Sequence, residues 1–123
     1  MSAIHHFSGK KTECAWEGIE IHKYGNEEFE GVTRQVIIGP QDNTPNFAVR
    51  YFRLEPGRHS NLERHPHEHG VVILHGRAQL QLNEEFFEVE PLDAIFISGN
   101  DLHQFTVIGK EPLGFLCVVT ARK

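Results

Sequence analysis

The sequence predicts an all-β protein whose short strands form a barrel or a sandwich. Segments rich in Val, Ile and Phe are short and are separated by Gly, Pro, Asn and Asp, which is the pattern of strands joined by turns. No long stretch keeps the roughly 3.6-residue apolar period of an amphipathic helix. Many short strands in one small chain are typical of barrels and sandwiches.

Nine segments carry the expected strands, namely 16–24, 32–39, 47–54, 71–75, 78–82, 86–89, 94–97, 103–107 and 114–119. The uninterrupted apolar run 71–74 suits a buried strand. Residues 78–82 read Ala-Gln-Leu-Gln-Leu, and this alternation predicts one face on the core and one in water. All six prolines fall near strand ends or in loops, where the missing N–H does least harm.

Length and charge narrow the class of protein. The 123 residues suffice for one hydrophobic core, so we expect a single domain spanning 1–123. The formal net charge of −5 gives no basic surface for nucleic acid. No apolar run approaches the roughly 20 residues of a membrane span, and the start lacks an apolar signal-peptide core. We therefore expect a cytoplasmic protein without nucleic-acid or membrane partners.

The two cysteines, Cys14 and Cys117, lie far apart and show no C-x-x-C spacing. In a reducing compartment two free thiols are the default.

Histidine usage is the unusual feature, because three of the nine histidines fall between positions 65 and 69. Glu63 and His65 are two residues apart, so on a strand they share a face. His69 lies near the start of the next expected strand, and His103 opens a later one. A closed barrel can bring these four side chains, Glu63, His65, His69 and His103, to one interior site.

Three imidazoles and one carboxylate suit one divalent transition metal ion, namely Mn, Fe, Cu, Ni or Zn. An ion that accepts six ligands would keep about two positions for water, substrate or oxygen. A closed tetrahedral zinc site would usually carry cysteines at short spacing, and the sequence has none there.

The spacing of these residues resembles the cupin superfamily. The first cupin motif is Gly, five residues, His-x-His, three or four residues, Glu, six residues and Gly. The chain reads Gly57, five residues, Glu63-x-His65, three residues, His69, six residues and Gly76, with Glu and His exchanged. The second motif is matched less closely, by Pro91-Leu92-Asp93 and by His103 at the position of the last ligand.

The resemblance covers about residues 31–121, which would form the metal-binding barrel after an N-terminal arm and strand at 1–30. It implies a cupin-type jelly-roll barrel, or double-stranded β-helix, and a homodimer with N-terminal strands packed across the interface. Residues 31–39 and 45–50 are similar to the lead-in of small bacterial manganese-binding cupins. The ligands of that subgroup are four histidines, one of which Glu63 replaces here.

Another register, with His65-x-His67 as the paired ligands, remains open. In that register the position of the carboxylate ligand would fall on Val71 or Val72, and the flanking glycines would not match the motif spacing. His67 is otherwise expected to orient a ligand or to occupy the turn, and His59 could line the mouth. Further side chains that can line the barrel are Arg50, Phe52, Gln79, Gln81, Phe96 and Phe105.

Two classes of function remain open. The first is a metalloenzyme acting on a small organic molecule, with a dioxygenase-type reaction preferred because open metal positions can bind O₂ or a chelating substrate. In that hypothesis Glu63 is the catalytic residue, which leaves the metal and accepts a proton. The resemblance also permits an isomerase or ring-opening enzyme on a sugar acid. The second class is a non-catalytic module that binds a metal or a small ligand.

Overall fold

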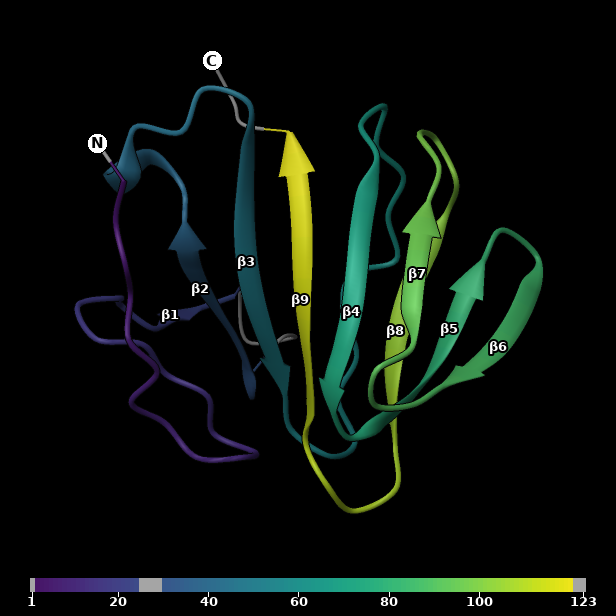
Figure 1. The fold of residues 1–123 in the computed structure, drawn as a ribbon. Helices are drawn as coiled ribbons and strands as arrows, with labels where there is room; N and C mark the ends of the chain where they lie inside the picture. Colours follow the sequence, from purple (N-terminus) through teal and green to yellow (C-terminus); the bar gives the residue numbers. More distant parts are fainter. Residues whose placement is uncertain (1, 25–29, 121–123) are drawn as a thin grey trace.

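A computed structural model describes residues 2–24 and 30–120, and it arranges their strands in two antiparallel sheets (Figure 1). The larger sheet contains, in spatial order, β1 (His22–Lys23), β2 (Val32–Ile38), β3 (Phe47–Leu54), β9 (Leu113–Thr120), β4 (His69–His75) and β7 (Ala94–Ile97). The smaller sheet contains β6 (Glu85–Val89), β5 (Arg77–Leu82) and β8 (His103–Ile108). One 3-10 turn, Pro40–Asp42, is the only helical element among the described residues, so the all-β prediction is confirmed.

Eight of the nine expected strands are present, and their ends differ from the prediction by at most two residues. The strand expected at 16–24 is wrong, because only His22–Lys23 pairs with a neighbour in the sheet. Gly18 adopts a φ of 76°, and the Ile19 amide donates to the Trp16 carbonyl at 3.1 Å, so the chain turns there. Within the described residues, no helix has the length and apolar character needed to cross a membrane.

The core lies between the inner faces of the two sheets. As the alternation predicted, Ala78 and Leu80 are buried while Gln79 is exposed. Three rings from three strands join the sheets, because Phe115 stacks on both Phe52 and Phe105 with centroid distances of 5.3 and 4.6 Å. Stacked aromatic rings bury large apolar areas, so this column is a rigid part of the core.

The connection between β3 and β4 crosses from one sheet to the other. Residues 55–68 leave the larger sheet, pair with β8 of the smaller one, and return to the larger sheet at His69. Glu63 and His103 exchange both backbone hydrogen bonds, at 3.1 and 2.9 Å. The segment is not a continuous strand, because the Phe105 amide donates to the Ser60 hydroxyl instead of to a backbone carbonyl.

The backbone conformation at the two glycines of the first motif favours glycine over other residues. Gly57 and Gly76 have φ values of 82° and 75°, in the left-handed region that side chains with a Cβ rarely adopt. At Gly76 an added Cβ would also lie 2.3 Å from the Pro112 carbonyl oxygen. These positions fix the turns on either side of the histidine-bearing segment.

The outer face of the larger sheet is covered in part by the N-terminal segment. The Trp16 ring packs against Tyr51 with a centroid distance of 5.4 Å. Beside this pair, His75 Nδ1 donates to the Pro112 carbonyl at 3.0 Å, which leaves Nε2 to accept from the Tyr51 hydroxyl at 2.5 Å. Burial is the main cause that lowers the pKa of His75 and raises that of Tyr51. Both groups therefore stay neutral at pH 7.

Lowering the pH below about 6.5 should destabilise the metal-free protein. Unfolded His75 takes up a proton near the ordinary histidine pKa, whereas the folded state, whose pKa is lower, resists protonation. The unfolded state therefore binds more protons in this window, and the free energy of unfolding falls as pH drops, by up to about 1.4 kcal/mol per pH unit for each such group.

Urea unfolding at about pH 7.5 and about pH 5.5 would measure this loss, with His75→Gln as the comparison. The variant should lose less stability than the wild type on acidification. A residual loss is expected from His69, whose pKa is also lowered. An identical pH dependence in both proteins would contradict the role of His75.

Candidate metal centre

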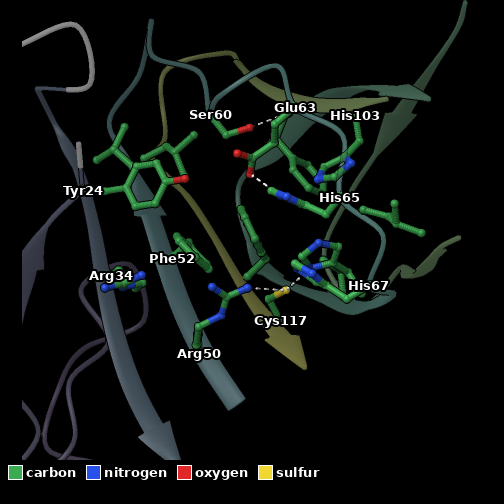
Figure 2. Close-up of a pocket in the computed structure, with 17 residues that line it drawn as sticks. Tyr24, Arg34, Arg50, Phe52, Ser60, Glu63, His65, His67, His103 and Cys117 are labelled. Carbon is green, nitrogen blue, oxygen red and sulfur yellow. Dashed lines mark hydrogen bonds and ion pairs between the residues drawn. The ribbon is translucent and has the colours of Figure 1, made fainter. Parts of the chain in front are cut away.

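A cavity of about 200 Å³ lies between the sheets, at the end where residues 55–68 cross over. Its walls come from β2, β3, β9 and β4 of the larger sheet, from β8, and from the crossing segment. Figure 2 shows imidazoles on one side of this space and the side chains of Tyr24, Arg34 and Arg50 on the other. The volume exceeds the roughly 30 Å³ of one water several times, so a small organic molecule can enter.

Three imidazoles converge in the cavity. His65, His69 and His103 each offer one ring nitrogen, and these three atoms all lie within 4.8 Å of one another. His65 comes from the crossing segment, while His69 and His103 are the first residues of β4 and β8. The sequence placed these residues at one site, and the structure brings them together from three separate parts of the chain.

His69 is oriented for metal binding. Its Nδ1 lies 3.3 Å from the Cys117 sulfur, and its Nε2 is buried without a hydrogen-bond partner among the described residues. Burial, with the nearby charges of His103, His67 and Arg50, lowers the pKa of His69 to about 4. The ring is therefore neutral at pH 7, and with Nδ1 donating to the sulfur a lone pair on Nε2 faces the other imidazoles. An unpaired buried nitrogen of this kind fits a metal ion.

His103 has the same arrangement. Its Nδ1 lies 2.9 Å from the Asp101 carbonyl oxygen, which can only accept, so Nδ1 carries the proton and Nε2 keeps its lone pair. Such a second hydrogen bond fixes the tautomer and the ring plane of a metal-binding histidine. The donor set therefore fits one divalent transition metal ion.

Glu63 lies beside these imidazoles, and the structure leaves its ligation as a prediction. Its carboxylate oxygen is 3.0 Å from His65 Nε2, but it is not a member of the group of mutually close ligand atoms. Two neighbouring ligands on an ion with bonds of about 2.1 Å also lie about 3 Å apart, so the separation suits a shared metal. The carboxylate also contributes, after burial, to raising the pKa of Tyr24.

His67 lies against the imidazoles without joining them. Its ring stacks on His65 at a centroid distance of 4.6 Å and lies 4.9 Å from the His69 ring. It lines the cavity, but its nitrogens are not among the mutually close ligand atoms. This arrangement favours an orienting role for His67 over the alternative register in which it pairs with His65.

Sequence reasoning missed Cys117 and Arg34, both of which line the cavity. Cys117 is two residues after the buried Phe115, so the alternation of its strand could have placed it inside. Burial raises the pKa of the Cys117 thiol, and the Arg50 charge opposes that shift. Both cysteines are free thiols, as predicted.

Among the candidate barrel-lining residues, Arg50, Phe52 and Phe105 line the cavity. Gln79 and Phe96 are exposed on other faces, Gln81 is half-buried outside the cavity, and His59 does not line it. The expectation for Phe96 fails because β7 turns this residue to the outer face of the larger sheet, opposite its buried neighbour Ile97.

The fold and the cavity define a small two-sheet β-barrel that could hold a metal ion through three histidines. Residues 50–119 match the cupin domain family, and the chain belongs to that family. The predicted cupin-type jelly roll is thereby confirmed.

The chain is similar to several known proteins. A 1-methylthio-D-xylulose 5-phosphate methylsulfurylase of Rhodospirillum rubrum is 40% identical over 116 residues, which cover 92% of this chain and 73% of the relative. The crystal structure of a cupin-2 domain protein from Rhodospirillum rubrum superposes with a TM-score of 0.83 at 39% identity, covering 95% of this chain and 79% of that one. A cupin 2 conserved barrel protein of Rhodopseudomonas palustris also has a TM-score of 0.83, at 31% identity, with coverages of 98% and 82%.

Replacing His65, His69 or His103 singly by Ala should weaken binding of a divalent transition metal by more than about 100-fold. A lost ligand should exceed the 10–100-fold effect that changing a neighbouring residue usually has. Elemental analysis of protein purified without a nickel column, followed by titration against a competing chelator, would measure the change. The control is His59→Ala, because His59 does not line the cavity. Wild-type affinity in all three variants would exclude this centre.

Cys117→Ala should weaken metal binding by about 10–100-fold, because His69 loses the group that fixes its ring. Cys117→Ser keeps a hydrogen-bond acceptor and should retain most of the affinity. The same chelator titration would compare the two variants. Equal affinities of Cys117→Ala and the wild type would show that the sulfur does not orient His69.

Proposed function

We propose that this protein is a metal-dependent enzyme whose substrate is a methylthio-substituted ketopentose phosphate. The observation that carries the proposal is the 40% identity, over 92% of the chain, to a 1-methylthio-D-xylulose 5-phosphate methylsulfurylase. The three convergent imidazoles and the cavity that they line support an enzymatic interpretation of that relationship.

The relative's substrate name defines the chemistry that the cavity would have to handle. A 1-methylthio-xylulose 5-phosphate carries its sulfur on the carbon next to a ketone and a phosphate at the far end. Chemistry at that carbon is helped by withdrawing electrons from the ketone oxygen and by moving a proton to or from the carbon.

The cavity offers groups for both tasks. A divalent transition metal held by His65, His69 and His103 would supply Lewis acidity toward a substrate oxygen. Glu63, with its carboxylate held 3.0 Å from His65, can take the proton of an attacking thiol and pass it to the substrate carbon. Cys117 holds a thiol proton on the opposite side of His69, because burial raises its pKa. Both side chains line the cavity.

This proposal replaces the dioxygenase-type reaction that the sequence favoured. That preference rested on open coordination positions, which all metal enzymes with exchangeable ligands share. An isomerase on a sugar acid would use the same carbonyl polarisation and proton transfer.

The exposed Val72, Phe96 and Val118 lie on the outer face of adjacent strands and support the homodimer expected from the sequence.

Metal-replete protein should consume 1-methylthio-D-xylulose 5-phosphate with a thiol as co-substrate, and the S-methyl proton signal would be followed by NMR. In this reaction the C1–S bond breaks, the methylthio group forms a mixed disulfide with the thiol, which is thereby oxidised, and C1 gains the proton of the thiol and is reduced to a methyl group. Glu63→Gln should lower kcat by about 10²–10⁴-fold, the usual contribution of a general acid or base, while metal remains bound. Glu68→Gln is the matched control, because Glu68 is exposed and lies outside the cavity.

Full turnover by metal-loaded Glu63→Gln would exclude the carboxylate from proton transfer. Failure of the metal-replete wild type to change the substrate would overturn the proposed reaction. Substrate-dependent oxygen uptake would then support the dioxygenase alternative, and tight ligand binding without turnover would support a binding module.

A further inference from the structure

Two arginines share the inner wall of the cavity opposite the imidazoles. Arg34 on β2 pairs with Phe52, and Arg50 on β3 pairs with Val36 and Cys117, so the two are diagonal neighbours on adjacent strands. Diagonal positions lie about 7–8 Å apart at the backbone, within reach of long side chains. Both side chains line the cavity, and Figure 2 shows Arg34 on the side away from His65 and His67, with the Arg50 guanidinium between them and directed toward Cys117.

Neither arginine has a carboxylate partner among the described residues. The arginine ion pairs found there join Arg53 to Glu55 and Arg77 to Glu88, all of which lie outside the cavity. Arg50 instead lies over the Phe52 ring, 5.0 Å from its centroid, and one guanidinium nitrogen lies 3.5 Å from the Cys117 sulfur. Its Nε is buried and has no hydrogen-bond partner in the described chain.

Two half-buried arginines on one wall, without a carboxylate partner in the described part of the chain, are costly for the fold. Each guanidinium loses part of its hydration, and the two charges repel each other across the cavity wall. An aromatic face and a sulfur atom satisfy few of the five donors of a guanidinium. A single anionic group placed between Arg34 and Arg50 would satisfy these donors and remove the repulsion.

We infer that Arg34 and Arg50 bind the phosphate group of the substrate and so select phosphorylated sugars over neutral ones. The inference rests on the proposed function for the choice of a phosphate ester, and it assigns the subsite that recognises it. Arginine suits this role because its planar donors match phosphate oxygens in pairs. The substrate would lie across the cavity with its phosphate at the arginines and its reacting end at the histidines.

The distance between the arginines and the histidines of the cavity is short. Arg50 contacts the Cys117 sulfur at 3.5 Å, and the same sulfur contacts His69 Nδ1 at 3.3 Å. The arginine end therefore lies within two contacts of a metal-facing imidazole. A chain of five carbons can span such a distance, which agrees with a pentose phosphate more closely than with a long or polymeric ligand.

Calorimetric titration of metal-loaded protein with D-xylulose 5-phosphate and with D-xylulose tests the inference. The wild type should bind the phosphate ester at least about tenfold more tightly than the free sugar, as expected for charge-assisted hydrogen bonds. Arg34→Gln and Arg50→Gln should each reduce this preference by about tenfold or more and leave the affinity for D-xylulose nearly unchanged. Arg50→Lys, which keeps the charge but loses the paired donors, should fall between.

The charge-matched control is Arg64→Gln, because Arg64 is exposed in the crossing segment and does not line the cavity. It should keep the wild-type preference, and metal content and thermal unfolding should confirm that each variant is folded. Equal binding of the two sugars by the wild type would overturn the inference. An equal loss of affinity for both sugars in the arginine variants would also overturn it, because it would indicate a general effect on the cavity.

The binding test is separate from the test of turnover. Phosphate preference that depends on Arg34 and Arg50, without turnover of the methylthio compound, would support the subsite and reject the proposed reaction. Turnover without any phosphate preference would support the reaction and reject the subsite.

Discussion

The candidate site depends on the pair of backbone hydrogen bonds that joins Glu63 to His103. Residues 55–68 connect two strands of the larger sheet, yet these bonds attach the segment to β8 of the smaller sheet. The attachment brings the crossing segment, the first residue of β4 and the first residue of β8 to the same end of the barrel. Further backbone bonds reinforce it, from the Ser60 amide to the Phe105 carbonyl at 2.9 Å and from the Asn100 amide to the His65 carbonyl at 2.5 Å. Together they hold His65 where its ring nitrogen lies within 4.8 Å of those of His69 and His103.

Two histidines of the same strand show how a structural imidazole differs from one in the candidate site. His69 and His75 begin and end β4, and an even spacing would normally put them on one face. A register irregularity between Ile73 and His75 turns the latter to the outer face, where both of its nitrogens have partners. His69 stays inside, and its Nε2 has no hydrogen-bond partner in the part of the chain that the structure describes. Since buried polar atoms are nearly always paired, the unpaired nitrogen marks the position where a ligand is needed.

The sequence was sufficient for eight of the nine strands and for the three histidines, because the former depend on local patterns and the latter on the spacing of the cupin motifs. Strand positions follow from the alternation of apolar residues and from turn residues, and His65, His69 and His103 follow from motif spacing. It was insufficient at 16–24, where the turn at Gly18 overrides an apparently strand-like composition. It also missed Arg34 and Cys117. The alternation along β9 could have placed Cys117 inside the barrel, but the approach of both residues to the cavity depends on which distant strands are neighbours in the larger sheet, and a local sequence pattern does not show that.

The cavity combines a group of histidines that suits many metal-dependent reactions with a pair of arginines that would select for charge. Three imidazoles around an open ion can support many reactions, which is why the same barrel geometry alone does not identify a substrate. The arginine wall adds a charge requirement at a fixed position relative to the histidines. A neutral small molecule would leave two partly desolvated guanidinium groups unpaired, whereas an anionic one would pair them, so the difference in binding favours anionic substrates. In the proposed function, selectivity would lie on strands β2 and β3, while the proton-transfer group Glu63 and the metal-binding His65 come from the crossing segment, so a change in one part need not disturb the other.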